Sequence, residues 1–286
     1  MPENHNGQTE RITNEPRRRL ISIQTSDRSE YAVSIMAVVL YQYPGGDGVG
    51  SVSPPCFKID LALRLVGADF ECVNLRSPKE VARVSKTGRL PAIDLDGKKI
   101  HDSIRILDEI ESRFDAPWLD ATETQRIHDR LWESDINEHL YWCGFNLRWV
   151  DPEGSARFFD ALFGRAPALS RLLVKTFFLP RQRKRSRLHG SGRRGRQEIL
   201  DEIGRGLDML VTDLREGPFL QGRPSPGRGD LAVASMLGQA GFRDSMPDVH
   251  RMVLARPPVL ANLRSTFAAC GGESPRWLGA GAGSVD

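Results

Sequence analysis

Apolar and polar residues follow two different patterns along this chain, and the pattern changes near residues 116–121. Before that point, short apolar runs typical of strands alternate with segments whose apolar residues recur at helical spacing. The first apolar run is MAVVLYQY, beginning at Met36, which predicts a strand. A helix is expected from Pro54, because proline is favoured at the first helical position and Gly67 supplies a natural stop. Its apolar face would consist of Cys56, Ile59, Leu63 and Val66.

The next segments complete an alternating unit. DFECVNL predicts a second strand and SPKEVARV a short helix. LPAID and KKI then flank Asp96-Gly97, a strong hairpin signal, and a further helix opens at Ser103. The resulting order, β-α-β-α-β-β-α over residues 35–115, predicts a thioredoxin-like domain.

From Glu123 onward only helical spacings occur. The predicted helices cover Glu123–Val150, a stretch through Leu179, Gln197–Leu214, Asp230–Gly241, Met246–Leu254 and Val259–Cys270. Because strands come first and helices second, the two kinds of element belong to separate domains. We therefore expect an α/β plus all-α protein whose helical domain spans residues 121–272.

The two ends of the chain lack such patterns. Residues 1–34 are mostly polar and are predicted to be a disordered extension, and residues 273–286 a flexible, Gly-rich tail. No apolar core of a secretory signal is present, and no apolar run approaches the ~20 residues that span a bilayer. The four cysteines are scattered without metal-ligand spacing, which favours a reducing compartment. A cytoplasmic protein without a bound metal is the expectation.

Charge changes this picture only locally. The net charge is +3, so nucleic acid is not expected as a partner. One basic run, between Arg181 and Arg196, contains no acidic residue and follows the apolar segment LLVKTFFLP. It is interpreted as a solvated linker between helices, with weak contact to an anionic surface as the alternative.

Ser53-Pro54-Pro55-Cys56 is the first candidate site, at the predicted start of the first helix. Free backbone N–H groups and the helix dipole favour a thiolate there. Ser53 could donate a hydrogen bond to a bound thiol, and Cys56 could itself ionise. Alternatively, Ser53 only caps the helix and Cys56 packs against the sheet.

Two further features follow along the chain. Pro91, after Leu90, opens a strand, where proline is tolerated and where the bond is either trans or cis. Asp102 and Ser103 precede a helix, whose free N–H groups suit a carboxylate, although simple capping is compatible.

The ordered set of these motifs resembles the N-terminal domain of glutathione transferases. The resemblance implies a cis Leu90-Pro91 bond, glutathione contacts from Leu90, Asp102 and Ser103, and thiol activation by Ser53. Glutathione would be a cosubstrate that attacks a small electrophile, and a homodimer is compatible with this plan.

Longer segments are similar to the failed-axon-connections and metaxin-like branch of that superfamily. They are SVSPPCFKIDLALRLVGADFE, EHLYWCGFNLRW and GPFLQGRPSPGRGDLAVASML. Two departures stand out, a long loop between Tyr43 and Ser53 and Gly227 at a capping position that usually holds Ser or Thr. Because the resemblance to that branch permits a protein that keeps the fold without turnover, a binding or scaffold role is the alternative to catalysis.

An aromatic stripe on the long predicted helix is the last candidate. Leu131, Glu138, Trp142, Phe145 and Trp149 share one face at helical spacing, with Tyr141 beside them. It is interpreted either as core or as the lining of an acceptor cleft between the domains.

Overall fold

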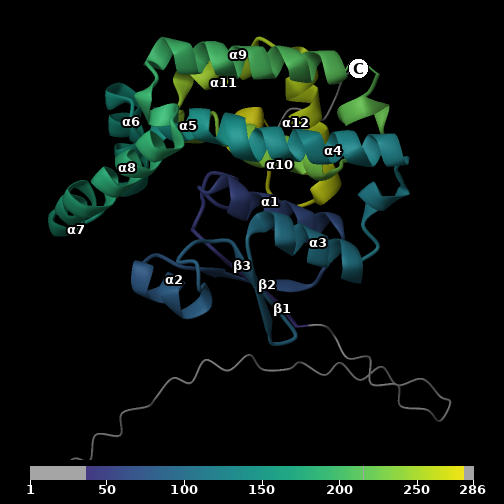
Figure 1. The fold of residues 1–286 in the computed structure, drawn as a ribbon, viewed down its shortest axis with the longest axis horizontal. Coiled ribbons are helices and arrows are strands. Elements are labelled where there is room, and N and C mark those ends of the chain that lie inside the picture. Colours follow the sequence, from purple (N-terminus) through teal and green to yellow (C-terminus); the bar gives the residue numbers. More distant parts are fainter. Residues whose placement is uncertain (1–36, 215, 280–286) are drawn as a thin grey trace, which may run out of the picture.

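The computed structural model describes residues 37–214 and 216–279, which form an N-terminal sheet domain and a larger helical domain (Figure 1). The sheet domain contains β1 (Val38–Gln42), α1 (Pro54–Leu65), β2 (Phe70–Asn74), α2 (Pro78–Val84), β3 (Ala92–Leu95), β4 (Lys98–His101) and α3 (Ser103–Arg113). This is the predicted order, and the α/β plus all-α architecture is confirmed. The expected extension at residues 1–34 lies outside the described residues.

The four strands form one sheet in the order β2-β1-β3-β4. β1 and β2 are parallel and joined through α1, while β3 runs antiparallel to both of its neighbours, β1 and β4. The predicted hairpin turn is present, because Asp96 and Gly97 both have left-handed backbone angles, with φ of 52° and 87°. Two successive left-handed residues suit the twist of a two-residue hairpin.

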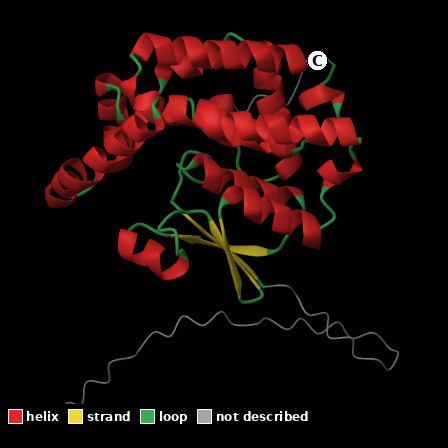
Figure 2. Cartoon of the chain, in the orientation of Figure 1, coloured by secondary structure: helices red, strands yellow, loops and turns green. Residues whose placement is uncertain are grey.

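The described residues of the second domain form helices joined by loops, without a strand (Figure 2). Its elements are η1 (Pro117–Asp120), α4 (Glu123–Asp135), η2 (Ile136–Leu140), α5 (Tyr141–Trp149), α6 (Pro152–Phe163), α7 (Ala168–Leu173), η3 (Val174–Phe178), α8 (Leu179–His189), η4 (Ser191–Arg193), α9 (Arg196–Asp213), η5 (Leu220–Gly222), α10 (Arg228–Leu237), η6 (Phe242–Asp244), α11 (Pro247–Leu254), α12 (Pro257–Cys270) and η7 (Arg276–Leu278). The predicted helix Glu123–Val150 corresponds to α4, the wide turn η2 and α5.

Helix α1 lies between the sheet and the helical domain (Figure 1). Its side chains are buried on nearly every face, including the charged Lys58 and Asp60. Phe57 stacks on Phe267 of α12, with 5.7 Å between the ring centroids. Because α1 also carries Ser53 at its start, this packing fixes the orientation of the candidate site relative to both domains.

Two sequence interpretations are wrong. Most of the basic run is not a linker, because Leu179–His189 forms α8, in which Leu179 and Ser186 are buried, and only residues 190–195 connect α8 to α9. Residues 273–279 are not a loose tail, since Leu278 is buried and the Trp277 indole donates a 2.7 Å hydrogen bond to the Gly238 carbonyl. Across residues 37–214 and 216–279, no helix combines the length and the apolar character needed to cross a bilayer.

Candidate functional site

The predicted site residues come from three loops that meet at one edge of the sheet. Tyr41, near the end of β1, pairs with Ala92 at the start of β3, and Ala92 pairs with His101 at the end of β4. The segment before Ser53 leaves β1 at this edge, Leu90-Pro91 enters β3 there, and Asp102 follows β4. The strand register thus brings together segments that are far apart in the sequence.

Ser53 is the residue before the first turn of α1, as predicted. Its backbone is extended, with φ of −99° and ψ of 114°, and its hydroxyl makes no capping bond to the helix. The loop before it is held by the Ser51 hydroxyl, which donates a 2.6 Å hydrogen bond to the Tyr43 carbonyl. The half-buried Ser53 hydroxyl therefore caps no backbone N–H group of α1, although it hydrogen-bonds to the Cys56 thiol one turn into that helix.

Cys56 lies one turn into α1 and is fully buried. It packs among Leu75, Val81, Leu90 and Ala92, on the sheet side of the helix. Burial raises the pKa of the Cys56 thiol to about 11, although hydrogen bonds from the Ser53 and Ser51 side chains act to lower it. This direction is opposite to the lowered pKa that the helix start alone would favour, and it supports the packing interpretation of Cys56.

A thiol of this kind should resist alkylation. At pH 8, only about one Cys56 side chain in a thousand is ionised when its pKa is about 11, and its sulfur is covered. Cys72 has a similarly raised pKa but is only half-buried, so it is a matched control. We expect iodoacetamide to modify native Cys56 at least about tenfold more slowly than Cys72, measured by peptide mass spectrometry. Faster modification of Cys56 than of Cys72 would instead support Cys56 as a reactive thiol.

The Leu90-Pro91 peptide bond is cis, as the resemblance implied. Leu90 is buried, and it lies outside the β1–β3 ladder, which begins at Ala92. Within the described residues, no backbone–backbone hydrogen bond involves Leu90. Its polar backbone groups are therefore available to another partner at this edge of the sheet.

Asp102 and Ser103 form the start of α3. The Asp102 carboxylate accepts hydrogen bonds from the N–H groups of Ile104 and Arg105, at 2.9 and 3.5 Å, so the expected cap is present. The Asp102 backbone is unusual, with φ of 80° and ψ of 128°. Residues other than glycine seldom adopt a left-handed φ, and such strain concentrates at binding sites. Ser103, the next residue, is buried.

Tyr43 belongs to the same region, although the sequence interpretation used it only to bound a loop. It packs against the cluster of buried residues that contains Cys56 and Leu90. Burial raises the pKa of its phenol, with a further increase from the neighbouring Cys56, so Tyr43 keeps its proton near neutral pH. A protonated phenol is a second hydroxyl donor at this site. A tyrosine at the end of the first strand was the signal that could have identified it.

The aromatic stripe does not remain on one face. Phe145 is buried, whereas Leu131 is exposed, because the wide turn η2 shifts the helical register between α4 and α5. Trp149 packs edge-on against Phe158 of α6, with 4.9 Å between the ring centroids. Most of the stripe therefore packs against neighbouring helices. Tyr141, beside the stripe, is close enough to Tyr43 to raise the pKa of that phenol.

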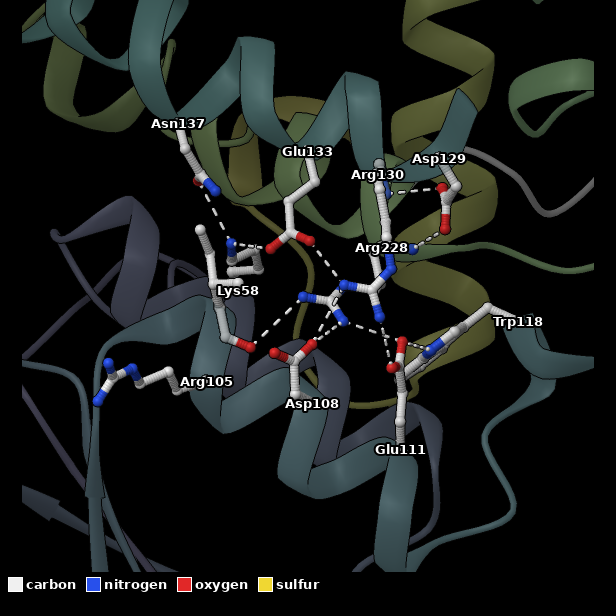
Figure 3. A network of polar contacts seen from close by, with 12 residues as sticks. Lys58, Arg105, Asp108, Glu111, Trp118, Asp129, Arg130, Glu133, Asn137 and Arg228 are labelled. Carbon is white, nitrogen blue, oxygen red and sulfur yellow. Dashed lines mark hydrogen bonds and ion pairs between the residues drawn. The ribbon is translucent and has the colours of Figure 1, made fainter. Parts of the chain in front are cut away.

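A buried ionic network joins the two domains beside this site (Figure 3). Glu133 of α4 accepts a 2.6 Å bond from Lys58 of α1 and another of 2.6 Å from Arg228 of α10. Arg228 also reaches Asp108 and Glu111 of α3, at 2.7 and 3.0 Å. Lys58 and Arg228 are each only 1% exposed, so their charges depend on these partners.

The start of α10 explains the unusual Gly227. A side chain at Gly227 would collide with the Arg223 guanidinium, because its β-carbon would lie only 1.9 Å from a guanidinium nitrogen. Arg223 instead bridges Asp129 and Asp230, at 2.9 and 2.8 Å. Asp129 of α4 also accepts from the N–H groups of Arg228 and Gly229, at 2.7 and 2.8 Å. The missing capping hydroxyl is therefore replaced by a carboxylate from another helix.

The chain is similar in sequence to a known protein family and to a curated relative. Residues 54–154 match the family described as the glutathione S-transferase N-terminal domain. Over 218 residues, 72% of this chain, it is 30% identical to Failed axon connections of Drosophila melanogaster. The chain spans half the length of that curated relative.

Solved structures share the fold at low sequence identity. A glutathione transferase of Phanerochaete chrysosporium matches with a TM-score of 0.59 and 18% identity, over 84% of this chain and 99% of its own. The beta-etherase LigF of Sphingobium matches with a TM-score of 0.57 and 18% identity, over 80% and 94%. A rice glutathione transferase in complex with glutathione matches with a TM-score of 0.55 and 16% identity, over 85% and 93%.

Proposed function

Because this chain belongs to the glutathione transferase superfamily, in its metaxin-like branch, we propose that it binds glutathione and uses the thiol to conjugate or reduce small electrophiles. The observation that carries this proposal is the meeting of Ser53, Leu90 and Asp102-Ser103 at one edge of the sheet. Each offers a polar group suited to a different part of an extended tripeptide.

Each of these polar groups would contact a different part of glutathione. The backbone of Leu90 would pair with the extended cysteinyl unit, because it is free of other backbone hydrogen bonds among the described residues. The Ser103 hydroxyl and the start of α3 would hold the γ-glutamyl carboxylate. The Asp102 carboxylate, although it caps α3, has further acceptor capacity for the neighbouring ammonium group.

Thiol activation is assigned to Ser53. Its hydroxyl would donate a hydrogen bond to the glutathione sulfur, and the N-terminus of α1 would favour the anionic form. Each unit by which the thiol pKa falls corresponds to about 1.4 kcal/mol of preferential thiolate stabilisation. The thiolate then attacks the electrophile, a sulfur–carbon bond forms, and the leaving group departs with its electron pair. Cys56 is not required for these steps.

Removing the Ser53 hydroxyl tests this proposal. We expect Ser53→Ala to lower turnover of glutathione with chlorodinitrobenzene by about a hundredfold, since one donor to the reacting charge is lost. Glutathione binding, measured by calorimetric titration, should weaken much less. Ser77→Ala is the matched control, because Ser77 caps the neighbouring α2 and its hydroxyl accepts from the Glu80 N–H. That control should keep full turnover.

A second candidate function is binding without turnover. It is favoured by the similarity to Failed axon connections, whose name refers to no chemical reaction. Glutathione binding with no conjugation by the unsubstituted chain would support this second function over the first. The absence of glutathione binding would exclude both the enzyme and a glutathione-dependent scaffold.

A further inference from the structure

A helical arm projects from the body of the molecule (Figure 1). It comprises α7, η3 and α8, and α7 forms the tip at the end farthest from both domains. Neither α7 nor η3 buries any residue, in contrast to α5, which lies at the base of the arm. Figure 2 shows that the arm is continuous helix rather than loop.

The tip exposes large apolar side chains at helical spacing. Leu169, Leu172, Leu173 and Phe177 are 68%, 59%, 50% and 58% exposed. Single exposed apolar residues are ordinary on protein surfaces, but a contiguous group of them marks a contact surface. Spacings of three and four residues place these four along one side of the arm.

Basic side chains accompany this apolar surface. No acidic residue occurs between Asp160 and Glu198. The exposed cations of the arm and its approach are Arg165, Lys175, Arg181, Arg183, Lys184 and Arg187. In the described part of the chain, none of these six forms an ion pair, although Arg171 of α7 pairs with Asp160 of α6. The arm therefore carries positive charge that the described part of the protein does not neutralise.

The base of the arm is held against the helical domain, whereas the apolar side chains of its tip stay exposed. His189 stacks on Trp142 of α5 with ring centroids 4.0 Å apart, and Arg185 lies 4.9 Å from the centroid of the same indole. Leu179 and Ser186 are buried against the helical domain. This anchoring, together with the contacts of Arg171 and Lys175 with the Phe159 ring of α6, holds α7 and η3 at a defined position.

We propose that the arm docks on a lipid bilayer with anionic headgroups, with the apolar tip in the interfacial region. A helix that combines large apolar residues with unpaired cations suits such a surface, because the cations face the anionic headgroups and the apolar residues enter the acyl chains beneath them. A second copy of the arm would meet like charges, which opposes self-association through this face. Nucleic acid would leave the leucines uncovered, and the basic run lacks aromatic residues for base stacking.

Vesicle binding tests the proposal with the full chain. We expect co-sedimentation with phosphatidylcholine vesicles that contain about a third phosphatidylserine, and much weaker binding to pure phosphatidylcholine. Binding should fall as salt rises from about 0.05 to 0.5 M, because headgroup attraction is screened. Removing three cations, as Arg181→Gln, Lys184→Gln and Arg187→Gln together, should lower the partition coefficient about a hundredfold.

A separate variant tests how much the apolar side chains of the tip contribute to vesicle binding. The triple substitution Leu172→Ser, Leu173→Ser and Phe177→Ser should weaken binding at least about tenfold, since these side chains are replaced by polar ones. Folding should survive because all three side chains are exposed, and circular dichroism checks this.

Removal of three cations elsewhere is the matched control for charge. Lys79→Gln, Arg83→Gln and Lys86→Gln, on α2 and just after it, should leave vesicle binding within about threefold of the unsubstituted chain. Equal binding to neutral and anionic vesicles, or unchanged binding in both arm variants, would overturn the proposal. So would loss of a dimer in the apolar variant without any change in vesicle binding.

Discussion

Replacing Glu133 by Gln should lower the free energy of unfolding by about 3–5 kcal/mol near neutral pH. The substitution keeps the shape of the side chain but removes the carboxylate that faces both Lys58 and Arg228. Arg228 retains Asp108 and Glu111, whereas Lys58 retains only the Asn137 amide oxygen, at 3.3 Å, among its described side-chain partners. A buried ammonium without a counter-charge is the main cost. Urea unfolding measures the difference.

The same variant should reveal a pH dependence. Burial by itself would raise the pKa of Glu133, but Lys58 and Arg228 outweigh it and hold that pKa below the ordinary 4.5. The carboxylate therefore stabilises the fold fully above about pH 4.5, and this contribution is lost as pH falls through the lower folded pKa. The stability gap between the unsubstituted protein and Glu133→Gln should close in acid.

A surface carboxylate provides the control for Glu133. Glu153 pairs with Arg157 one turn later on α6, and both side chains are about half exposed. Glu153→Gln should change the free energy of unfolding by less than about 1 kcal/mol at any pH. If Glu133→Gln changes the free energy of unfolding as little as Glu153→Gln does, then burial of the Lys58 and Arg228 charges does not require the Glu133 carboxylate.

Gly227→Ser should destabilise the protein by about 3 kcal/mol, although Ser is ordinarily the better capping residue. A β-carbon at this position would lie 1.9 Å from the Arg223 guanidinium, so Arg223 would have to leave its position. Its departure would leave the buried carboxylates of Asp129 and Asp230 without their cation. Thermal and urea unfolding both measure this loss.

Gly195 is a matched control, because it also precedes a helix. Its backbone is extended, with φ of −72°, and a β-carbon there would meet nothing within 4 Å. Gly195→Ser should therefore be neutral or stabilising by a few tenths of a kcal/mol, as expected for a free capping position. An Arg223→Gln background should remove much of the penalty of Gly227→Ser. A stabilising Gly227→Ser would contradict the proposed exclusion by Arg223.

Local signals predicted most of the elements. Pro54 begins α1 because its missing N–H and fixed φ suit the first helical position. Asp96-Gly97 turns the hairpin because both residues tolerate left-handed angles. Along the rest of the chain, the change from alternating elements to helical spacing separated the two domains.

The candidate site was predictable as a set of residues, but its chemistry was not. Ser53, Pro91, Asp102 and Ser103 stand at element starts, and their grouping with Leu90 into one glutathione site is what the resemblance to glutathione transferases implies. Cys56 stands at a helix start that favours ionisation, but its burial in the fold raises the thiol pKa instead. Tyr43 joins the site because the register of β1 and β3 places it beside Leu90.

Contacts between segments far apart in the sequence decided the buried ionic network and the structure of the basic run. Lys58 and Glu133 are 75 positions apart, and Glu133 and Arg228 are 95 apart, so no local pattern links them. The composition of the basic run indicates a linker because its residues are mostly solvated, yet burial of Leu179 and Ser186 against neighbouring helices holds it as α8.

The sequence by itself determined the order of elements, the two-domain plan and the resemblance to glutathione transferases, since these depend on spacing and on conformational preferences of nearby residues. Only the tertiary structure decided which charges are buried together, which thiol is buried and which helices keep their side chains exposed to solvent. These properties depend on removal from water, and an individual residue is removed from water only by neighbours that the fold brings to it.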